Sequence, residues 1–247
     1  LPPSLRVFTV AGREVLRMDA SEAQRLNACL TVKDVKKYCI QSVDGVSIYR
    51  HRLLLEDEVL DDTKQLPLEL WPLDLQLLVC PFHTPDANSI REFRAAVRSG
   101  EDAALEALLK KGIDPNLPGE RWHGGSALQL ASSNGSVEMV RMLLEATSDP
   151  NMADHEGKSP LLVASNKGYL EIVRCLLEMD ADANLANCND NTPLWVASWK
   201  GHFEVVRSLL KSKANHRKVN HNVESALWVA SEHGHLKVVQ LLIDAEA

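Results

Sequence analysis

Few residues in this sequence have the types and spacing that catalysis or metal binding requires. His123-Gly-Gly-Ser126 has the composition of an oxyanion loop, but Ser126 also suits a helix cap, and no GxSxG nucleophile elbow accompanies it. His233-Gly-His235 could bind a metal or serve in packing and at a helix end, and we favour the second interpretation. Because HExxH and glycine-rich phosphate motifs are also missing, the sequence predicts no catalytic residue, metal, cofactor or small-molecule substrate.

Two charged segments each allow a functional and a structural interpretation. Five acids within residues 56–62 could bind a cation, although such a run beside a strand turn is more typical of a solvated loop. Between Lys200 and Lys218 six basic residues accompany one acid, Glu204. This segment could dock an anionic surface, or it could form the outer faces of amphipathic helices. The five cysteines are scattered and never spaced as CxxC, so we expect reduced thiols.

The composition is that of a soluble globular protein. The chain has 247 residues, 25% of them charged, and a net charge of -7. This mild acidity argues against a nucleic-acid partner, because phosphate binding relies on clustered Lys and Arg. No apolar run approaches the ~20 residues that span a bilayer, so no transmembrane segment is expected. We expect a cytoplasmic protein by default, or an organelle protein if a targeting peptide has been removed before Leu1.

A 33-residue repeat fills the last two thirds of the chain. Four hexapeptides of one type begin 33 residues apart, a glycine lies nine residues after each start, and apolar pairs keep the same step. The hexapeptides begin at Ser126, Ser159, Thr192 and Ser225, the glycines are Gly135, Gly168, Gly201 and Gly234, and the pairs begin at Leu143, Leu176, Leu209 and Leu242.

Each position of the repeat has a local physical role. The Ser or Thr oxygen can accept a hydrogen bond from the first free amides of a helix, and Pro fits the next position. The glycine can end this short helix in a left-handed conformation. A second helix follows with apolar residues at helical spacing, and then a turn such as Asp149-Pro-Asn151. The repeat is predicted to be helix, turn, helix and projecting loop.

These residues resemble the ankyrin repeat, whose signature T-P-L-H-x-A has the same period. The resemblance implies an all-α solenoid of about five repeats over residues 83–247. They are a capping repeat at 86–120 without the Thr-Pro signature, and repeats starting near 121, 154, 187 and 220. Trp195 and Trp228 occupy the place of the signature His, which implies packing between repeats.

The resemblance also implies that finger loops and the exposed face of the first helices bind a protein partner. Trp199 stands out among these positions, because other repeats have Ser, Asn or Glu there and tryptophan is enriched in interface hot spots. Packing against a neighbouring helix or the end of the N-terminal domain is the alternative role for its ring. The predicted binding residues are Trp122, His123, His155, Glu156, Lys158, Asn166, Lys167, Cys188, Asn189, Asn191, Trp199, Lys200, His221, Asn222, Glu224, Glu232 and His233.

Residues 1–82 predict a separate domain, which makes the fold class α+β. Alternating segments predict strands at 5–10, 15–18, 51–55 and 73–79. A helix capped by Thr31 is expected between the hairpin and the third strand, with Val32 and Val35 facing inward and Lys36 facing solvent. This order of elements is a β-grasp.

The N-terminal domain resembles the ubiquitin-like domain through Arg52-Leu53-Leu54-Leu55 and Leu60-Asp61-Asp62. Under this resemblance only Leu54 and Leu78 could stand in for the recognition patch of ubiquitin. The segment runs on into Cys80-Pro-Phe82 without a Gly-Gly end. The domain would therefore act as a fixed docking module and not as a conjugated modifier.

These expectations predict a non-catalytic scaffold or adaptor that binds a protein through its ankyrin repeats, as part of a larger assembly in one version of the hypothesis. The alternative is a ubiquitin-pathway regulator or a proteasome or ligase adaptor that docks through residues 1–82. The pairing of domains is similar to that of ubiquitin-like/ankyrin proteins abundant in dinoflagellates. An enzyme would need a catalytic domain beyond Ala247.

Overall fold

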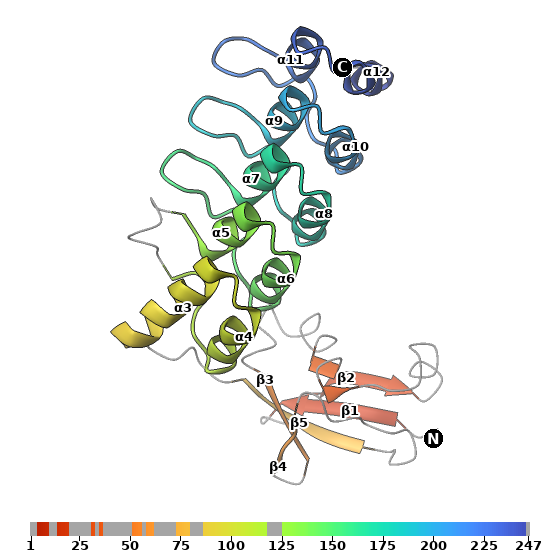
Figure 1. Ribbon diagram of the computed structural model, residues 1–247. Coiled ribbons are helices and arrows are strands. Elements are labelled where there is room, and N and C mark those ends of the chain that lie inside the picture. The colour runs from red at the N-terminus through yellow and green to blue at the C-terminus, as the bar shows by residue number, and fades with distance from the viewer. Residues whose placement is uncertain are drawn as a thin grey trace. The chain divides into compact units, whose positions relative to one another are not determined.

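The computed structural model has two compact units, and the main division between them falls at Pro85 and Asp86. Figure 1 shows the N-terminal strands and the C-terminal helices. The structure describes residues 4–9, 14–19, 31–32, 35–36, 51–55, 58–61, 73–79, 86–117 and 125–245. None of the helices within these residues is long and apolar enough to cross a membrane.

The N-terminal unit contains a five-stranded mixed sheet of order β2-β1-β5-β3-β4. Strand β1 pairs antiparallel with β2 and parallel with β5, and β3 pairs antiparallel with both β4 and β5. Alternate strand residues such as Leu5, Val7, Leu53 and Leu75 are fully buried, as expected when one face of a sheet packs on a core. The strands are β1 (Ser4–Thr9), β2 (Glu14–Asp19), β3 (His51–Leu55), β4 (Glu58–Val59) and β5 (Leu73–Val79).

Lys36 is buried, and the expectation that it faces solvent is wrong. Val32, Val35 and Lys36 are helical, and all three are buried, with Lys36 only 2% exposed. Their i, i+3, i+4 spacing places them on one helix face, and the aliphatic stem of lysine can cover apolar surface. The charge pattern was a weaker guide here than the helical period.

The C-terminal unit consists of paired helices. In Figure 1 the first helices α5, α7, α9 and α11 form one row and their partners α6, α8, α10 and α12 form a second, with loops projecting beyond the first row. The pairs are α3 (Ala87–Ser99) with α4 (Asp102–Lys110), α5 (Ala127–Asn134) with α6 (Val137–Glu145), α7 (Pro160–Lys167) with α8 (Leu170–Glu178), α9 (Pro193–Trp199) with α10 (Phe203–Lys211), and α11 (Ala226–Glu232) with α12 (Leu236–Asp244).

The predicted helix caps are confirmed. Ser126, Ser159, Thr192 and Ser225 each accept a hydrogen bond from the backbone N–H three residues later, at 3.1–3.2 Å. The four predicted glycines have φ between 72° and 80°, the left-handed region that glycine enters without steric cost. Helices α9 and α11 end two residues before the glycine, and the residues between, Lys200 and His233, are their C-caps.

Core residues also recur every 33 residues. Leu143, Leu176, Leu209 and Leu242 are fully buried, one in each of the second helices α6 to α12. Trp195 is 9% exposed, which confirms its predicted packing between repeats. The same prediction is wrong for Trp228, which is 47% exposed. Trp195 lies beside the finger loop of the next repeat, at residues 220–224. The described residues contain no equivalent loop after Trp228, so its ring is left exposed.

Candidate functional site

The finger loops are fixed by one Asp or Asn side chain each. Asp154 Oδ1 accepts hydrogen bonds from the backbone N–H of the residues two and four positions later, at 3.0 and 2.9 Å. Asn187 and Asn220 repeat this pair of bonds 33 and 66 residues further on, all at 3.0 Å. Adjacent loops are joined edge to edge, because Cys188 N–H donates to the Glu156 carbonyl. Such Asx turns give the loops a defined shape before any partner binds.

Most of the predicted finger-loop residues lie at the surface of these loops. His155, Glu156, Cys188, Asn189, His221 and Asn222 are exposed, and Lys158, Asn191 and Glu224 are half-buried. Trp122 and His123 lie outside the described residues. The Glu156 carboxylate lies 2.5 Å from Lys158 Nζ and raises the pKa of that ammonium by hydrogen bonding. His221 Nε2 lies 3.0 Å from Asp190 Oδ2.

Trp199 is held in place by side chains from two repeats. Its ring is half-buried and tilted against Trp195, with 5.9 Å between the ring centroids. Lys200 Nζ lies 3.8 Å from the Trp199 ring centroid, within the range of a cation–π interaction. The indole Nε1–H donates to His233 Nε2 at 3.0 Å. Because His233 Nε2 accepts this bond, its Nδ1 carries the proton and donates to the Val229 carbonyl, 3.0 Å away.

His235 serves packing and a helix end, as the sequence predicted. Its Nε2 lies 3.0 Å from the Trp199 carbonyl oxygen, at the end of α9, and its ring lies against Gly201. His202 makes the equivalent contact with the Asn166 carbonyl one repeat earlier, at 3.2 Å. Within the described residues, no three His, Cys, Asp or Glu side chains lie together as metal ligands would.

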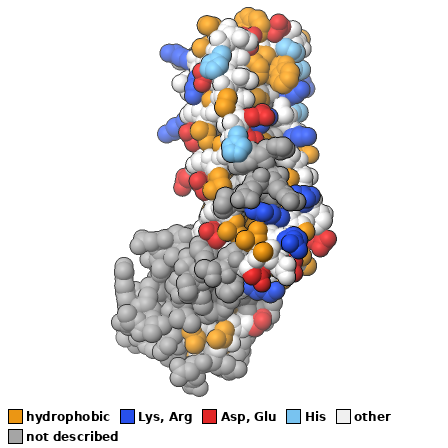
Figure 2. All heavy atoms as spheres, turned by 90° about the vertical axis from the view of Figure 1, so that its left-hand side faces the viewer, with side chains coloured by type: hydrophobic (Ala, Val, Ile, Leu, Met, Phe, Trp, Pro, Cys, Tyr) orange, Lys and Arg blue, Asp and Glu red, His pale blue; other side chains and the backbone are white. Residues whose placement is uncertain are grey.

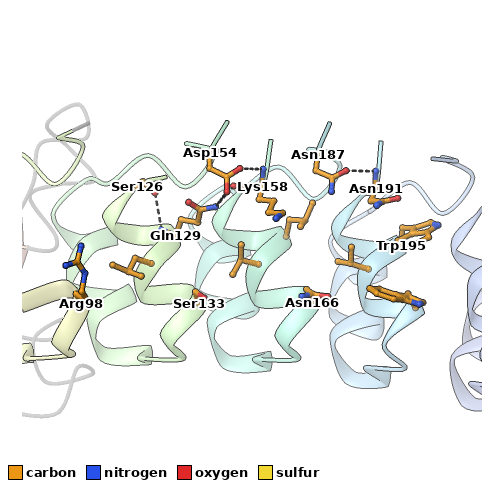
Figure 3. Close-up of a pocket in the computed structure, with 15 residues that line it drawn as sticks. Arg98, Ser126, Gln129, Ser133, Asp154, Lys158, Asn166, Asn187, Asn191 and Trp195 are labelled. Atoms are coloured by element: carbon orange, nitrogen blue, oxygen red, sulfur yellow. Dashed lines mark hydrogen bonds between the residues drawn. The ribbon is translucent and has the colours of Figure 1, made fainter. Parts of the chain in front are cut away.

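A groove of about 620 Å³ runs along the first helices from α3 to α9. Figure 3 shows Arg98, Ser133 and Asn166 in one row on the helices, and the finger-loop residues Lys158 and Asn191 along the opposite edge. Leu130, Leu162, Val163, Val196, Trp195 and Trp199 contribute the apolar part of the lining. The groove is thus formed by all the repeats from the first to the fourth.

The groove contains only part of the predicted site. Lys158, Asn166, Asn191 and Trp199 line it, whereas Lys167, Lys200, Glu232, His233 and the loop tips do not. Two further lining residues, Arg98 and Gln129, were not predicted from the sequence. The repeat period could have identified Arg98, because steps of 35, 33 and 33 residues lead from it to Ser133, Asn166 and Trp199.

Gln129 and Trp195 occupy equivalent positions but differ in their bonding. Gln129 Nε2 donates to Asp154 Oδ2 and to the Lys158 carbonyl, both at 2.8 Å, and so ties its helix to the next finger loop. The buried indole Nε1 of Trp195 has no hydrogen-bond partner among the described residues. The tryptophan therefore replaces a polar contact with apolar lining.

The described cysteines are free thiols, as the sequence predicted. Cys175 is half-buried and Cys188 is exposed. The Cys175 sulfur raises the pKa of the neighbouring Arg141 guanidinium by hydrogen bonding. Cys29, Cys39 and Cys80 lie outside the described residues.

Comparison with known proteins agrees with the repeat geometry. The family model for ankyrin repeats (3 copies) matches residues 93–187, 128–220 and 180–247, which together span more than half of the chain. No curated protein matches the sequence. Together with the helix caps and the leucines buried every 33 residues, this match shows that the chain belongs to the ankyrin-repeat family.

Proposed function

We propose that this protein is a non-catalytic scaffold or adaptor that binds a protein partner in the groove along α3 to α9. Ankyrin repeats generally mediate protein–protein interactions, and the family match supports a protein partner. The observation that carries the proposal is Trp199, a half-buried ring at the groove that is held by Trp195, Lys200 and His233. In one version of this proposal the protein is a subunit of a larger assembly.

A fixed tryptophan is suited to recognition for a physical reason. Ordering a free side chain at an interface costs about 0.5–1.5 kcal/mol. The Trp199 ring is already oriented by its hydrogen bond to His233 and its contact with Trp195, so binding a partner forfeits little further rotamer freedom. The part of the ring that faces the groove supplies apolar area to the partner.

Capture from an extract of the source cells tests the proposal. Wild-type chain, Trp199→Ala and Trp228→Ala are immobilised in turn, and retained proteins are quantified by mass spectrometry. We expect proteins that wild type and Trp228→Ala retain and that Trp199→Ala loses by tenfold or more. Thermal unfolding of each variant is the control for folding. The absence of any protein whose retention depends on Trp199 would contradict the proposal.

A second candidate function rests on the strand order of the N-terminal unit. We propose that residues 1–82 form a ubiquitin-like β-grasp domain in front of ankyrin repeats at 83–247, and that it docks on a ubiquitin receptor, ligase or proteasome. The order β2-β1-β5-β3-β4, with β1 parallel to β5, supports this interpretation. The proposed likeness to ubiquitin-like/ankyrin proteins of dinoflagellates depends on the same domain pairing.

The candidate docking residues are Leu54, which is half-buried in β3, and Leu78, which lies in β5 with a side chain outside the described part of the structure. Binding of the full chain to purified proteasomes is compared with that of Leu54→Ala/Leu78→Ala. Loss of binding in the double variant supports the docking role. Absence of binding by the wild-type chain to proteasomes and to ubiquitin receptors refutes it.

A further inference from the structure

One row of equivalent side chains follows the groove from repeat to repeat. Arg98, Ser133, Asn166 and Trp199 occupy the same place in α3, α5, α7 and α9, and all four line the groove. Figure 3 shows the first three in line. Along this row the side-chain type changes from a cation through a hydroxyl and an amide to an aromatic ring. The groove is therefore not uniform, and its two ends have different chemistry.

Three cations in or beside the row have no anionic partner among the described residues. Arg98 lines the groove, and Lys167 and Lys200 lie directly after two residues of the row; all three are exposed, and none forms an ion pair with a described acid. The nearby acids are already engaged by the protein. Asp154 accepts three hydrogen bonds, and Glu156 pairs with Lys158.

Arg98, Lys167 and Lys200 thus place unpaired positive charge in and beside the row, in a chain with a net charge of -7, while the negative charge of Asp154 lies among the finger-loop residues of the lining. Figure 2 shows the side to which the finger loops project, where acidic, basic and hydrophobic side chains are interspersed. Because the Debye length is about 8 Å at physiological ionic strength, a bound segment responds mainly to the cations beside it. Complementary charge on the partner is therefore negative.

The middle of the row can bind a peptide backbone. No hydrogen bond to another described residue engages the Ser133 hydroxyl or the Asn166 side-chain amide, although the Asn166 carbonyl accepts from His202. A hydroxyl and an amide can both donate and accept, which matches the alternating N–H and C=O groups of an extended chain. Because every second side chain of an extended chain points to the same face, alternate side chains of such a segment would face the apolar lining residues.

We infer that the groove binds an extended acidic segment of a partner protein, with a carboxylate at Arg98 and a large apolar side chain on Trp199. This inference rests on the proposed function and specifies the chemistry of the partner. A second carboxylate beside the apolar residue meets Lys200. Glu232 occupies the next place in the row after Trp199, so acidic residues of the partner stop at Trp199.

The spacing within the segment follows from the helices. Neighbouring packed helices lie about 8–10 Å apart, and three such steps separate Arg98 from Trp199, which gives roughly 24–30 Å. An extended chain advances about 3.3 Å per residue. The carboxylate and the apolar residue are therefore separated by about 7–9 residues.

Selection from a display library of random 12-residue peptides, with the full chain immobilised, tests the inference. We expect enriched peptides with an acid and an aromatic or large aliphatic residue 7–9 positions apart. The leading peptide is then synthesised and titrated against the variants. Arg98→Glu and Trp199→Ala should each weaken binding at least tenfold, while the matched controls Lys237→Glu and Trp228→Ala change it less than twofold.

A charge exchange separates recognition from misfolding. A peptide whose acid is replaced by lysine should bind wild type at least tenfold more weakly and regain affinity for Arg98→Glu. Enrichment of Trp199-dependent peptides that lack the acid, or no rescue by the exchange, overturns the acidic segment while leaving the proposed function standing. Peptides that bind independently of Trp199, or no enrichment at all, overturn the inference. The proposed function is refuted as well only if the capture of proteins from the cell extract is also independent of Trp199.

Discussion

Replacing Gly201 with alanine should destabilise the repeats by about 2–3 kcal/mol. Gly201 has a φ of 73°, and an L-residue in this region costs roughly 1–2 kcal/mol. A Cβ atom built there would lie 2.5 Å from His235 Nδ1 and 2.8 Å from its Cγ. Because both atoms belong to a rigid ring, the whole imidazole must move and its hydrogen bond to the Trp199 carbonyl is lost, which costs about 1 kcal/mol more.

A double-mutant cycle separates the two contributions. His235→Ala alone should cost about 1–2 kcal/mol through lost packing and the lost hydrogen bond. The double variant should be about as stable as Gly201→Ala, because the ring that clashes is already gone. The coupling free energy is therefore about 1–2 kcal/mol, measured from urea unfolding followed by circular dichroism.

Gly234→Ala is the matched control. Gly234 has a φ of 72°, but a Cβ atom there meets nothing within 4 Å. Its substitution should cost only the backbone contribution of roughly 1–2 kcal/mol. The reasoning is refuted if Gly201→Ala and His235→Ala are additive within about 0.5 kcal/mol, or if Gly201→Ala costs no more than Gly234→Ala.

Two further substitutions test the loops and the helix interface. Asn187→Ala removes the acceptor for two loop N–H groups and should destabilise the protein by about 1–3 kcal/mol. Asn187→Asp should be nearly neutral, because Asp154 makes the same bonds in its own loop. In Asn187→Ala we expect faster hydrogen exchange at the Asn189 and Asn191 amides, and unchanged exchange would contradict the role of Asn187. Ser165→Ala removes a fully buried hydroxyl that has no partner among the described residues and should stabilise the protein by about 1 kcal/mol; a lower urea midpoint would show that the hydroxyl is bonded after all.

Local, periodic features were predictable from the sequence. A cap such as Thr192 depends on a hydrogen bond from a residue only three positions away, Trp195. The burial of Leu176 was predictable because the same apolar residue recurs one repeat before and one repeat after it, and all three are buried. The failures have physical reasons too. Trp228 carries the sequence of a packed residue, but burial depends on a following loop, which no local pattern encodes.

The contacts that hold Trp199 were harder to foresee. Its hydrogen bond to His233 joins residues 34 positions apart, one more than the repeat, because the two residues are not equivalent in their helices. The sequence offered a binding role and a packing role for Trp199 as alternatives. The structure shows the packing, with the ring fixed by Trp195 and Lys200 while it still lines the groove.

The residues of the row vary from repeat to repeat, unlike those of the core. The fold uses the same leucine at Leu143, Leu176, Leu209 and Leu242, since every repeat must fill the same space between helices. The row from Arg98 to Trp199 is built on the same scaffold but has a different residue at each step. A position that stability required would repeat as the leucines do. The succession of cation, hydroxyl, amide and indole shows that core packing does not fix the residue type along the row, which leaves these positions free for the binding role that we propose.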